Sequence, residues 1–393
     1  MNMTVAFRSP LGARNLDFRL TEDHRLLGET VERLVREQYG FEVRRAAIAS
    51  KAGWDREFWS QLAHLGILGA PLPEQAGGLG GGALATMLVM RAFGAGLVVA
   101  PYLSTILCAA TLIARAGSSA QQQSHLPAII RGEEIFAFAC SEHGDHGTLA
   151  NMRTTAVRDG SRYRINGRKA LVVAAPWADW IIVVARLAGA RTEPGALGAF
   201  IVSPQAKGLT AKPARTIDGG VASEMTLEDL TVDAESLIGH AHGVGSDIEQ
   251  IVDEATVALC AEACGAVDTL LTMTVEYSKV RKQFGQPIGS FQVLQHRMVD
   301  MLIGRYQADA IVHRASLCLS ADTRTRQQAV SACKAQVGRI GTQVAQAAVQ
   351  THGGIGTTAE AAVSHYFRRL AVINMQFGNI EDHVTRYAEL LDG

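Results

Sequence analysis

The chain has 393 residues, of which 48% are hydrophobic and 19% are charged. This composition indicates a globular protein of two or three packed units and excludes a disordered chain. The 37 basic and 38 acidic residues give a formal net charge of −1 with no basic patch or tail, which disfavours nucleic acid and anionic membranes as partners.

Neither a secretory signal nor a metal site is expected. The opening MNMTVAFRSPLGARN lacks an apolar core, and runs such as GAGLVVAPYL are too short and interrupted to span a bilayer. The six cysteines include no CxxC pair, and Cys260 and Cys264 are interpreted as small buried hydrophobes. His240 and His242 lie in a glycine-bounded turn without acidic or thiol partners. We therefore expect a cytoplasmic protein in a reducing compartment.

Residues from about 20 to 132 are predicted to form helices. Thr21 is a candidate N-cap ahead of Glu22 and Asp23, whose charges favour the helix dipole. A loop rich in proline and glycine, ending in GGLGGG, interrupts the helices. ALATMLVMRAFGAGLVVA then resumes helical periodicity and is predicted to be buried on most sides.

The pattern changes to short β-type runs from about residue 133 to 240. The runs are bounded by Gly, Asp or Pro, as turns require. They are FAFAC, TTAV, YRIN, KALVVAA, DWIIVVAR, GAFIV and SEMTLEDLTV. Seven or eight such strands indicate a small barrel or a two-sheet β domain.

After Gly245 the chain is predicted to be helical to its end. Ser246 and Glu249 have the spacing of a capping box, and the following segment is apolar nearly all round, as in the central helix of a bundle. Three further helices are predicted at about 291–319, 325–351 and 360–390. Short links between these helices indicate a four-helix arrangement.

Two segments in the last third could bind phosphate. Arg281 follows the end of one long predicted helix, and Gln292 begins the next. The turn between the two helices therefore brings together an arginine and the free backbone N–H groups at the start of a helix. In AVQTHGGIGTTAE, Gln350 closes a helix and the glycines at 353 and 354 let the backbone come close to a phosphate. On spacing alone, both segments are better explained as helix-connecting turns.

Taken together and in this order, the motifs resemble the acyl-CoA dehydrogenase family. The resemblance runs nearly end to end, through GILGAPLPEQAGGLGGG, INGRK, LEDLTVDAESLIG, RKQFGQPIGSFQ and VQTHGGIGTTAE. It implies an α+β fold with an N-terminal α domain at 1–132, a middle β-barrel domain at 133–240 and a C-terminal four-helix bundle at 241–393. It also implies FAD bound non-covalently at a subunit interface, and therefore a tetramer or at least a dimer.

The resemblance assigns FAD contacts to positions of this chain. In the family, the arginine of RKQFG and the Gln and Gly-Gly of QTHGG reach the pyrophosphate and adenosine of FAD in a neighbouring subunit. The corresponding residues are Arg281, Phe284, Gln292, Gln350, Gly353 and Gly354. All of these positions match the family pattern.

The half of the site that holds the flavin ring departs from the family. CSEHG resembles a Thr-Glu-Pro-Gly strand, with Ser141 replacing the threonine donor and His143 replacing proline. The usual serine at the flavin pyrophosphate falls at about Gly147, and the usual Trp-Ile-Thr after INGRK becomes Leu-Val-Val. Leu-Val-Val is interpreted simply as a buried strand. We expect this half to be eroded.

The catalytic base of the family also differs. The family's carboxylate removes the α-proton of an acyl-CoA thioester while the β-hydrogen leaves as hydride for the flavin. A gapless comparison places this base at Phe377, and the alternative glutamate of some members at Ala255. Glu254 and Glu381 are the candidates for a displaced base, although Glu381 is also explained as a solvated residue at a helix start. No catalytic residue is therefore assigned.

Three functions fit these features. The leading one is a subunit of a heteromeric acyl-CoA dehydrogenase that lacks the base and works beside a paralogue that carries it. It is most similar to small subunits of the pimeloyl-CoA dehydrogenase type, among enzymes acting on dicarboxyl- or steroid-side-chain CoA thioesters. The second is a self-sufficient homotetramer with a displaced base, and the third is a scaffold that only completes a partner's FAD site. An electron-transferring flavoprotein is the family's usual electron acceptor.

Overall fold

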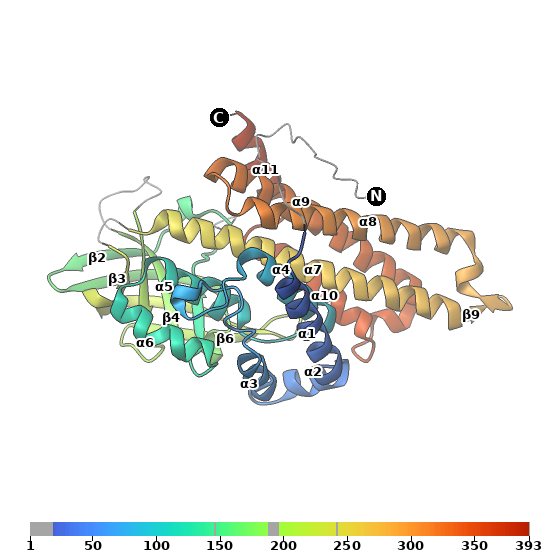
Figure 1. Cartoon of the computed structure of the whole chain (residues 1–393), viewed down its shortest axis with the longest axis horizontal. Coiled ribbons are helices and arrows are strands. Elements are labelled where there is room, and N and C mark those ends of the chain that lie inside the picture. The colour runs from blue at the N-terminus through green and yellow to red at the C-terminus, as the bar shows by residue number, and fades with distance from the viewer. Residues whose placement is uncertain (1–18, 145–146, 188–195, 241–242, 393) are drawn as a thin grey trace.

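The computed structural model of the chain describes residues 19–144, 147–187, 196–240 and 243–392. Helices form the N-terminal part, a sheet forms the middle, and long helices form the C-terminal part (Figure 1). The α+β class expected from the sequence is confirmed. The domain boundaries at 132 and 240 stay a prediction.

The N-terminal helices begin where the sequence predicts them. Thr21 caps the first helix, because its hydroxyl accepts a hydrogen bond from the backbone N–H of His24 at 3.2 Å. The elements are α1 (Glu22–Gln38), α2 (Phe41–Ala49), α3 (Arg56–His64), η1 (Glu74–Ala76), α4 (Gly82–Gly96), the π-helical segment η2 (Leu103–Ala110), α5 (Thr111–Ala116) and α6 (Ser119–Ile130).

Eight strands follow in one mixed sheet. They are β1 (Phe136–Ala139), β2 (Thr155–Asp159), β3 (Arg162–Val173), β4 (Trp180–Leu187), β5 (Leu197–Val202), β6 (Leu209–Arg215), β7 (Val221–Asp233) and β8 (Leu237–Ile238). The described strands pair in the order β6-β7-β3-β2-β4-β5-β8, and β1 pairs in parallel with β4. The short helical turns η3 (Leu149–Asn151), η4 (Ala175–Trp177) and η5 (Ala234–Ser236) connect them.

The apolar strands are buried on both faces. In β4, Ile181 and Val183 belong to a core enclosed by the sheet itself. Ile182 and Val184 belong to the main core shared with the helices. Side chains alternate across a strand, so an uninterrupted apolar run serves two cores.

Two predictions for the sheet needed correction. YRIN and KALVVAA are one strand, β3, whose pairing with β7 has irregular register after Ile165 and after Lys169. The strand β6 was missed because its residues are mostly exposed, mix polar and apolar types without regular alternation, and include Pro213. Edge strands tolerate that composition, because only one side of the strand needs backbone partners.

The C-terminal part is a helical bundle built around α7. Its helices are α7 (Gly245–Val280), α8 (Gln292–Cys318), α9 (Thr323–His352), α10 (Ala362–Met375) and α11 (Ile380–Asp392). A two-stranded hairpin of β9 (Lys282–Gln283) and β10 (Gln286–Pro287), followed by η6 (Ile288–Ser290), joins α7 to α8. A 3₁₀ turn, η7 (Gly353–Thr357), follows α9.

Two predictions for the bundle were wrong in detail. The expected helix at 360–390 is broken into α10 and α11, because Phe377 and Gly378 adopt positive φ angles of 55° and 94° that an α-helix excludes. The expected capping box at Ser246 is absent. The helix α7 begins one residue earlier, at Gly245 after Val244, which leaves Ser246 inside the first turn.

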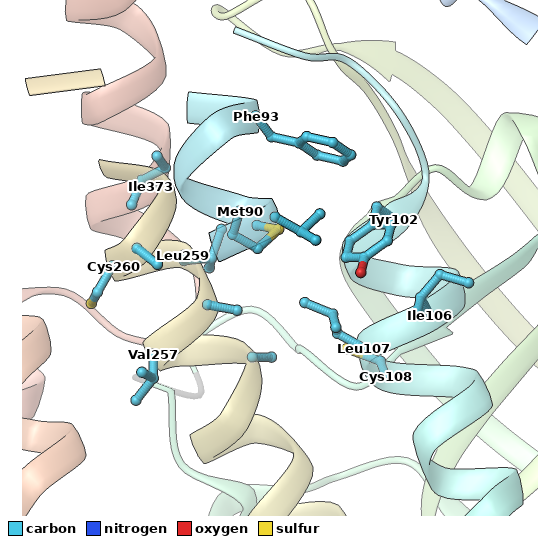
Figure 2. Packing of buried hydrophobic residues seen from close by; sticks show 14 of the residues in the cluster. Met90, Phe93, Tyr102, Ile106, Leu107, Cys108, Val257, Leu259, Cys260 and Ile373 are labelled. Carbon is cyan, nitrogen blue, oxygen red and sulfur yellow. The ribbon is translucent and has the colours of Figure 1, made fainter. Parts of the chain in front are cut away.

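Glycines set the distance between α4 and α7. A Cβ at Gly94 would lie 1.8 Å from the carbonyl oxygen of Glu262, and one at Gly265 would lie 1.9 Å from that of Arg91. The two backbones therefore touch without intervening side chains. Around this contact, side chains such as Met90 of α4, Leu107 of η2 and Leu259 of α7 fill the main core (Figure 2).

The helix α7 is the centre of the bundle. Among the described helices it alone is long and apolar enough to cross a membrane, yet 72% of its most apolar window is buried inside the fold. A core helix surrounded by other helices has the same composition. Cys260 and Cys264 of this helix are buried in the main core, as expected for small hydrophobes.

A network of buried charges joins the three parts of the chain. Arg369 of α10 donates to both carboxylate oxygens of Glu262 in α7, at 2.6 and 2.7 Å, and to Asp218 of the β6–β7 turn at 2.8 Å. Arg44 of α2 donates to the backbone carbonyls of Asp218 and Leu97. Buried charges need partners, so this network fixes how the parts meet.

We predict that Gly265→Ala lowers the free energy of unfolding by about 3 kcal/mol or more, because overpacking against a backbone oxygen forces α4 and α7 apart. Urea titration measures the effect. Gly28→Ala in α1 is the matched control, since its Cβ would meet Leu88 at an ordinary 3.5 Å. Equal stability of the two variants would contradict the close contact.

Candidate active site and flavin site

Two of the family motifs meet in the middle domain. Lys169 of INGRK donates from Nζ to Oε1 of Glu142 in CSEHG at 2.8 Å, and both side chains are almost fully buried. Glu142 also accepts from the backbone N–H groups of Arg153 at 2.7 Å and Thr154 at 2.9 Å. This pair holds the segment after β1, where Ser141 lies half-buried and accepts at its carbonyl from Ala170 at 2.9 Å.

The charge state of Glu142 follows from these contacts. Burial by itself raises the pKa of this carboxyl, but the Lys169 ammonium and the donors of Thr154 and Arg153 outweigh burial. The net pKa therefore lies below the ordinary value, and the pair is ionised at neutral pH. The sequence comparison placed both motifs beside the flavin ring but gave no sign of their direct contact.

The residue at the usual serine position has no room for a side chain. Gly147 has a φ angle of 70°, and a Cβ there would lie 2.7 Å from the Cα of Gly378 and 2.9 Å from the carbonyl carbon of Phe377. A serine at 147 would therefore collide with the loop that carries the expected base position. The two departures from the family pattern, at Gly147 and Phe377, are in contact.

The loop between α10 and α11 is held from beneath by Lys334 of α9. Its ammonium donates to the carbonyls of Ile373 and of Gln376, the latter at 2.8 Å, and thereby caps the last turn of α10. Lys334 is fully buried, and desolvation lowers its pKa to about 8. A lysine inside the apolar run VSACKAQV is a signal of such a role, but the sequence interpretation did not use it.

The other side of the loop is held by α11. His383 shares a hydrogen bond of 2.9 Å from Nε2 with the carbonyl of Phe377, and burial lowers its pKa to about 3, which keeps the ring neutral. The neutral ring therefore donates from Nε2 to that carbonyl. Asn379 caps α11, because its side chain accepts from the N–H groups of Glu381 at 2.7 Å and Asp382 at 3.1 Å. These contacts fix Phe377, whose half-buried side chain packs against the main core.

The two candidates for a displaced base lie elsewhere. Glu254 is ion-paired with Arg115 of α5 at 2.8 Å and accepts from Gln250 at 2.9 Å. Glu381 is exposed in the first turn of α11, where a carboxylate favours the helix dipole. Ala255, the alternative base position, is fully buried in the core. The roles of Glu254 and Glu381 as bases stay a prediction.

The residues matched to the neighbour's FAD gather at the opposite end of α7. Tyr277 and His352 stack with their ring centroids 4.4 Å apart, which brings the end of α7 against the end of α9. This contact places Arg281 and the pair Gly353–Gly354 at one end of the bundle, beside the β9–β10 hairpin (Figure 1). The two motifs that the sequence singled out are therefore close in space.

This end of the bundle is open to solvent. All six matched residues are exposed, and Phe284 is 90% exposed. A Cβ at Gly353 or Gly354 would meet nothing within 4 Å, and Arg281 has no ion pair among the described residues. Arg281 has no ion-pair partner among the described residues, and no side chain covers the nearby glycine backbone. Both groups are therefore free to bind the pyrophosphate of a ligand from outside this chain. These residues fit FAD.

The two halves of the flavin site are far apart within one chain. Asp253 of α7 pairs with Arg326 of α9 at 3.0 Å and with Arg386 of α11 at 2.8 Å, near the loop of Phe377. Tyr277 lies at the other end. Asp253 and Tyr277 are about 24 residues apart in α7, which corresponds to about 36 Å along a helix. One FAD molecule cannot contact both halves of the same chain. Among the described residues, no cluster of three or more potential metal ligands is present.

Comparison with known protein families matches three segments of the chain to three domains of one family. Residues 21–133, 137–230 and 242–391 match the acyl-CoA dehydrogenase N-terminal, middle and C-terminal domains. A mitochondrial isovaleryl-CoA dehydrogenase of Pongo abelii is 31% identical over 378 residues, which are 92% of this chain and 87% of that protein. The chain belongs to the acyl-CoA dehydrogenase family; its cofactor is FAD and its reaction class is the dehydrogenation of acyl-CoA.

Two solved structures show the same fold. The ChsE4–ChsE5 complex from Mycobacterium tuberculosis has a TM-score of 0.87 at 27% identity, covering 96% of this chain and 99% of that one. A variant of the Tcur3481–Tcur3483 steroid ACAD has a TM-score of 0.85 at 28% identity, covering 94% of this chain and 98% of that one. Both agree with the helix–sheet–helix architecture described above.

We predict that Lys169→Met lowers the free energy of unfolding by about 3–5 kcal/mol, because it leaves Glu142 buried without its cation. The double variant Lys169→Met/Glu142→Gln recovers part of this loss. The pKa of Glu142 is lower in the folded state, so its stabilising contribution is present above pH 4.5 and is lost as the pH falls through the folded pKa.

Acid titration followed by circular dichroism measures this pH dependence. The Glu142→Gln variant is expected to lose less stability than the wild type on acidification below pH 4.5. Identical acid transitions of the two proteins would contradict a stabilising Glu142–Lys169 pair.

Proposed function

We propose that this chain is the base-lacking subunit of a hetero-oligomeric, FAD-dependent acyl-CoA dehydrogenase. Its partner is a paralogue that carries the glutamate. The observation that carries the proposal is Phe377, which stands where the family has its base and is fixed by Lys334 and His383. A carboxylate is needed there because the α-proton of a thioester is only weakly acidic.

The surroundings of Phe377 support an inactive pocket. Gly147 lies against the backbone of the same loop, and the half-buried phenyl ring packs on the core. The carboxylate of Glu254 is engaged in an ion pair with the Arg115 guanidinium at 2.8 Å. The side chain of Glu381 is exposed to solvent in the first turn of α11. Neither glutamate replaces the missing base in this arrangement.

The exposed end of the bundle gives the chain its proposed role. Arg281, Gln350 and the two glycines would hold the pyrophosphate and adenosine of an FAD whose flavin ring lies in the partner. When bound there, FAD supplies the hydride acceptor of the reaction. This chain contributes charge-assisted donors and an open backbone surface, while the partner provides proton abstraction and substrate binding.

The apolar surface of α8 supports an oligomer. Val293, Val299, Ile303 and Tyr306 are 50–68% exposed along this one helix. Apolar residues repeated on one exposed helix are typical of a subunit interface. We propose a tetramer with a paralogous large subunit.

The similar solved structures support a heteromer, since the names of both give two different chains. One is a steroid ACAD, which supports a steroid-side-chain CoA thioester as substrate, with a dicarboxyl-CoA thioester of the pimeloyl type as the second possibility. We also propose an electron-transferring flavoprotein as electron acceptor and a cytoplasmic location.

We predict that the purified chain alone has no acyl-CoA dehydrogenase activity and gains it with the glutamate-bearing partner. Loss of a positioned base costs about 10²–10⁴-fold in rate. Turnover of thioesters of several lengths with an artificial electron acceptor measures this. Glu254→Gln and Glu381→Gln should leave the activity of the complex unchanged. Activity of the chain alone that collapses in either variant would establish a displaced base, and a complex without turnover would establish a scaffold.

We predict that Arg281→Ala weakens FAD binding by the assembly about 10–100-fold, because it removes a charge-assisted contact to pyrophosphate. Flavin absorbance per assembly after gel filtration measures the occupancy. Lys279→Ala is the matched control, since Lys279 lies on the same exposed end but pairs with Glu276 at 2.6 Å. Full flavin content in the Arg281 variant would overturn the assignment of RKQFG to FAD.

A further inference from the structure

A cavity of about 420 Å³ lies where the N-terminal helices meet the middle domain. Its walls come from the segment before α3, the turn η4 and the edge strand β6 with the start of β7. None of the residues matched to FAD lines it, and neither does the loop of Phe377. Its volume is in the range of about 300–1,000 Å³ that small-molecule sites have.

The floor of the cavity is aromatic and rigid. Trp54 and Trp177 stack with ring centroids 5.2 Å apart and planes inclined by 27°. Trp54 also makes an edge contact with Trp59, and Trp177 donates from Nε1 to the carbonyl of Ala52 at 2.7 Å. The buried Trp54 thus holds the half-buried Trp177 in place as a preformed apolar surface.

The rim of the cavity is positively charged. Lys51, Arg56 and Arg215 line it, and no acidic residue does. None of the three has an ion pair with a described carboxylate. Arg56 lies over the Trp54 ring at 5.4 Å, and Arg215 donates to the carbonyl of Ile48 at 2.5 Å, so both guanidinium groups are positioned by neutral partners. Their charge is left for a ligand.

A second observation points to a missing acceptor. The indole N–H of Trp54 is buried and has no hydrogen-bond partner among the described residues, although Trp54 is only 3% exposed. Trp177 beside it has its partner. A buried donor without an acceptor is rare in folded proteins. Because this N–H is closed to solvent, Trp54 supports the cavity wall from inside, and the half-buried Trp177 is the indole that a ligand would contact.

We propose that this cavity binds a small organic anion, with a ring or other apolar body against Trp177 and a phosphate or carboxylate group against Arg56, Lys51 and Arg215. Planar guanidinium groups bind both kinds of anion through paired hydrogen bonds. The site is separate from the flavin site and from acyl-CoA chemistry, and it does not depend on the function proposed above.

The test uses the FAD-saturated protein and three probes: phenyl phosphate, benzoate and phenol. Phenyl phosphate or benzoate is expected to bind with a dissociation constant of about 1 mM or tighter, measured by calorimetry and by the change in tryptophan fluorescence. Phenol lacks the charge and is expected to bind more weakly. Whichever anion binds more tightly identifies the charged group.

Variants assign the binding to this cavity. Arg56→Gln on the exposed rim is expected to weaken anion binding about fivefold, and Trp177→Leu, which removes the aromatic surface, is expected to weaken it as well. Lys212→Gln is the matched control, since Lys212 is an exposed cation of the same strand β6 that does not line the cavity. It should leave the affinity unchanged.

The outcomes are distinct. Saturable binding of an anion that Arg56→Gln weakens and Lys212→Gln does not supports the site. No saturable binding of either anion at about 10 mM would overturn it. Equal losses in the arginine and lysine variants would show a response to net charge alone and would overturn it too. If Trp177→Leu does not fold, the Arg56→Gln comparison still decides.

Discussion

The buried charges around Arg369 are the constraint on which the arrangement of this protein depends. One guanidinium joins a carboxylate of α7 to a carboxylate of the β6–β7 turn, and Arg44 ties the same turn to the N-terminal helices. Removing Arg369 would leave the carboxylates of Glu262 and Asp218 buried without their cation. The middle sheet therefore has one position against the bundle, and that position sets Gly147 against the loop of Phe377.

The same principle holds the loop of Phe377 in place. Lys334, a cation without water around it, donates to two helix-terminal carbonyls, and His383, kept neutral by burial, donates to the carbonyl of Phe377. A loop fixed by buried groups on both sides keeps one conformation. This rigidity holds the half-buried Phe377 ring against the main core.

The length of α7 separates two tasks. Its first half supports the junction with the sheet, and Arg281, directly after its last turn, is exposed to solvent. The charge of Arg281 at this exposed end carries little desolvation free energy, because the guanidinium stays in contact with water until a ligand binds. The function proposed above uses this separation, because a subunit without a base can still offer the exposed end of its bundle to a neighbour's FAD.

The sequence by itself determined the α+β class, the helical cap at Thr21, the buried strands and the two motifs that meet at the end of the bundle. Local signals such as periodicity, capping residues and glycine pairs act between neighbours along the chain, so they can be interpreted without a fold. Tertiary structure alone decided the break at Phe377, the contact of Gly147 with that loop, the Lys169–Glu142 pair and the cavity at Trp54. Each of these joins residues far apart in the sequence, and burial decides which charges pair and which backbone turns are tolerated.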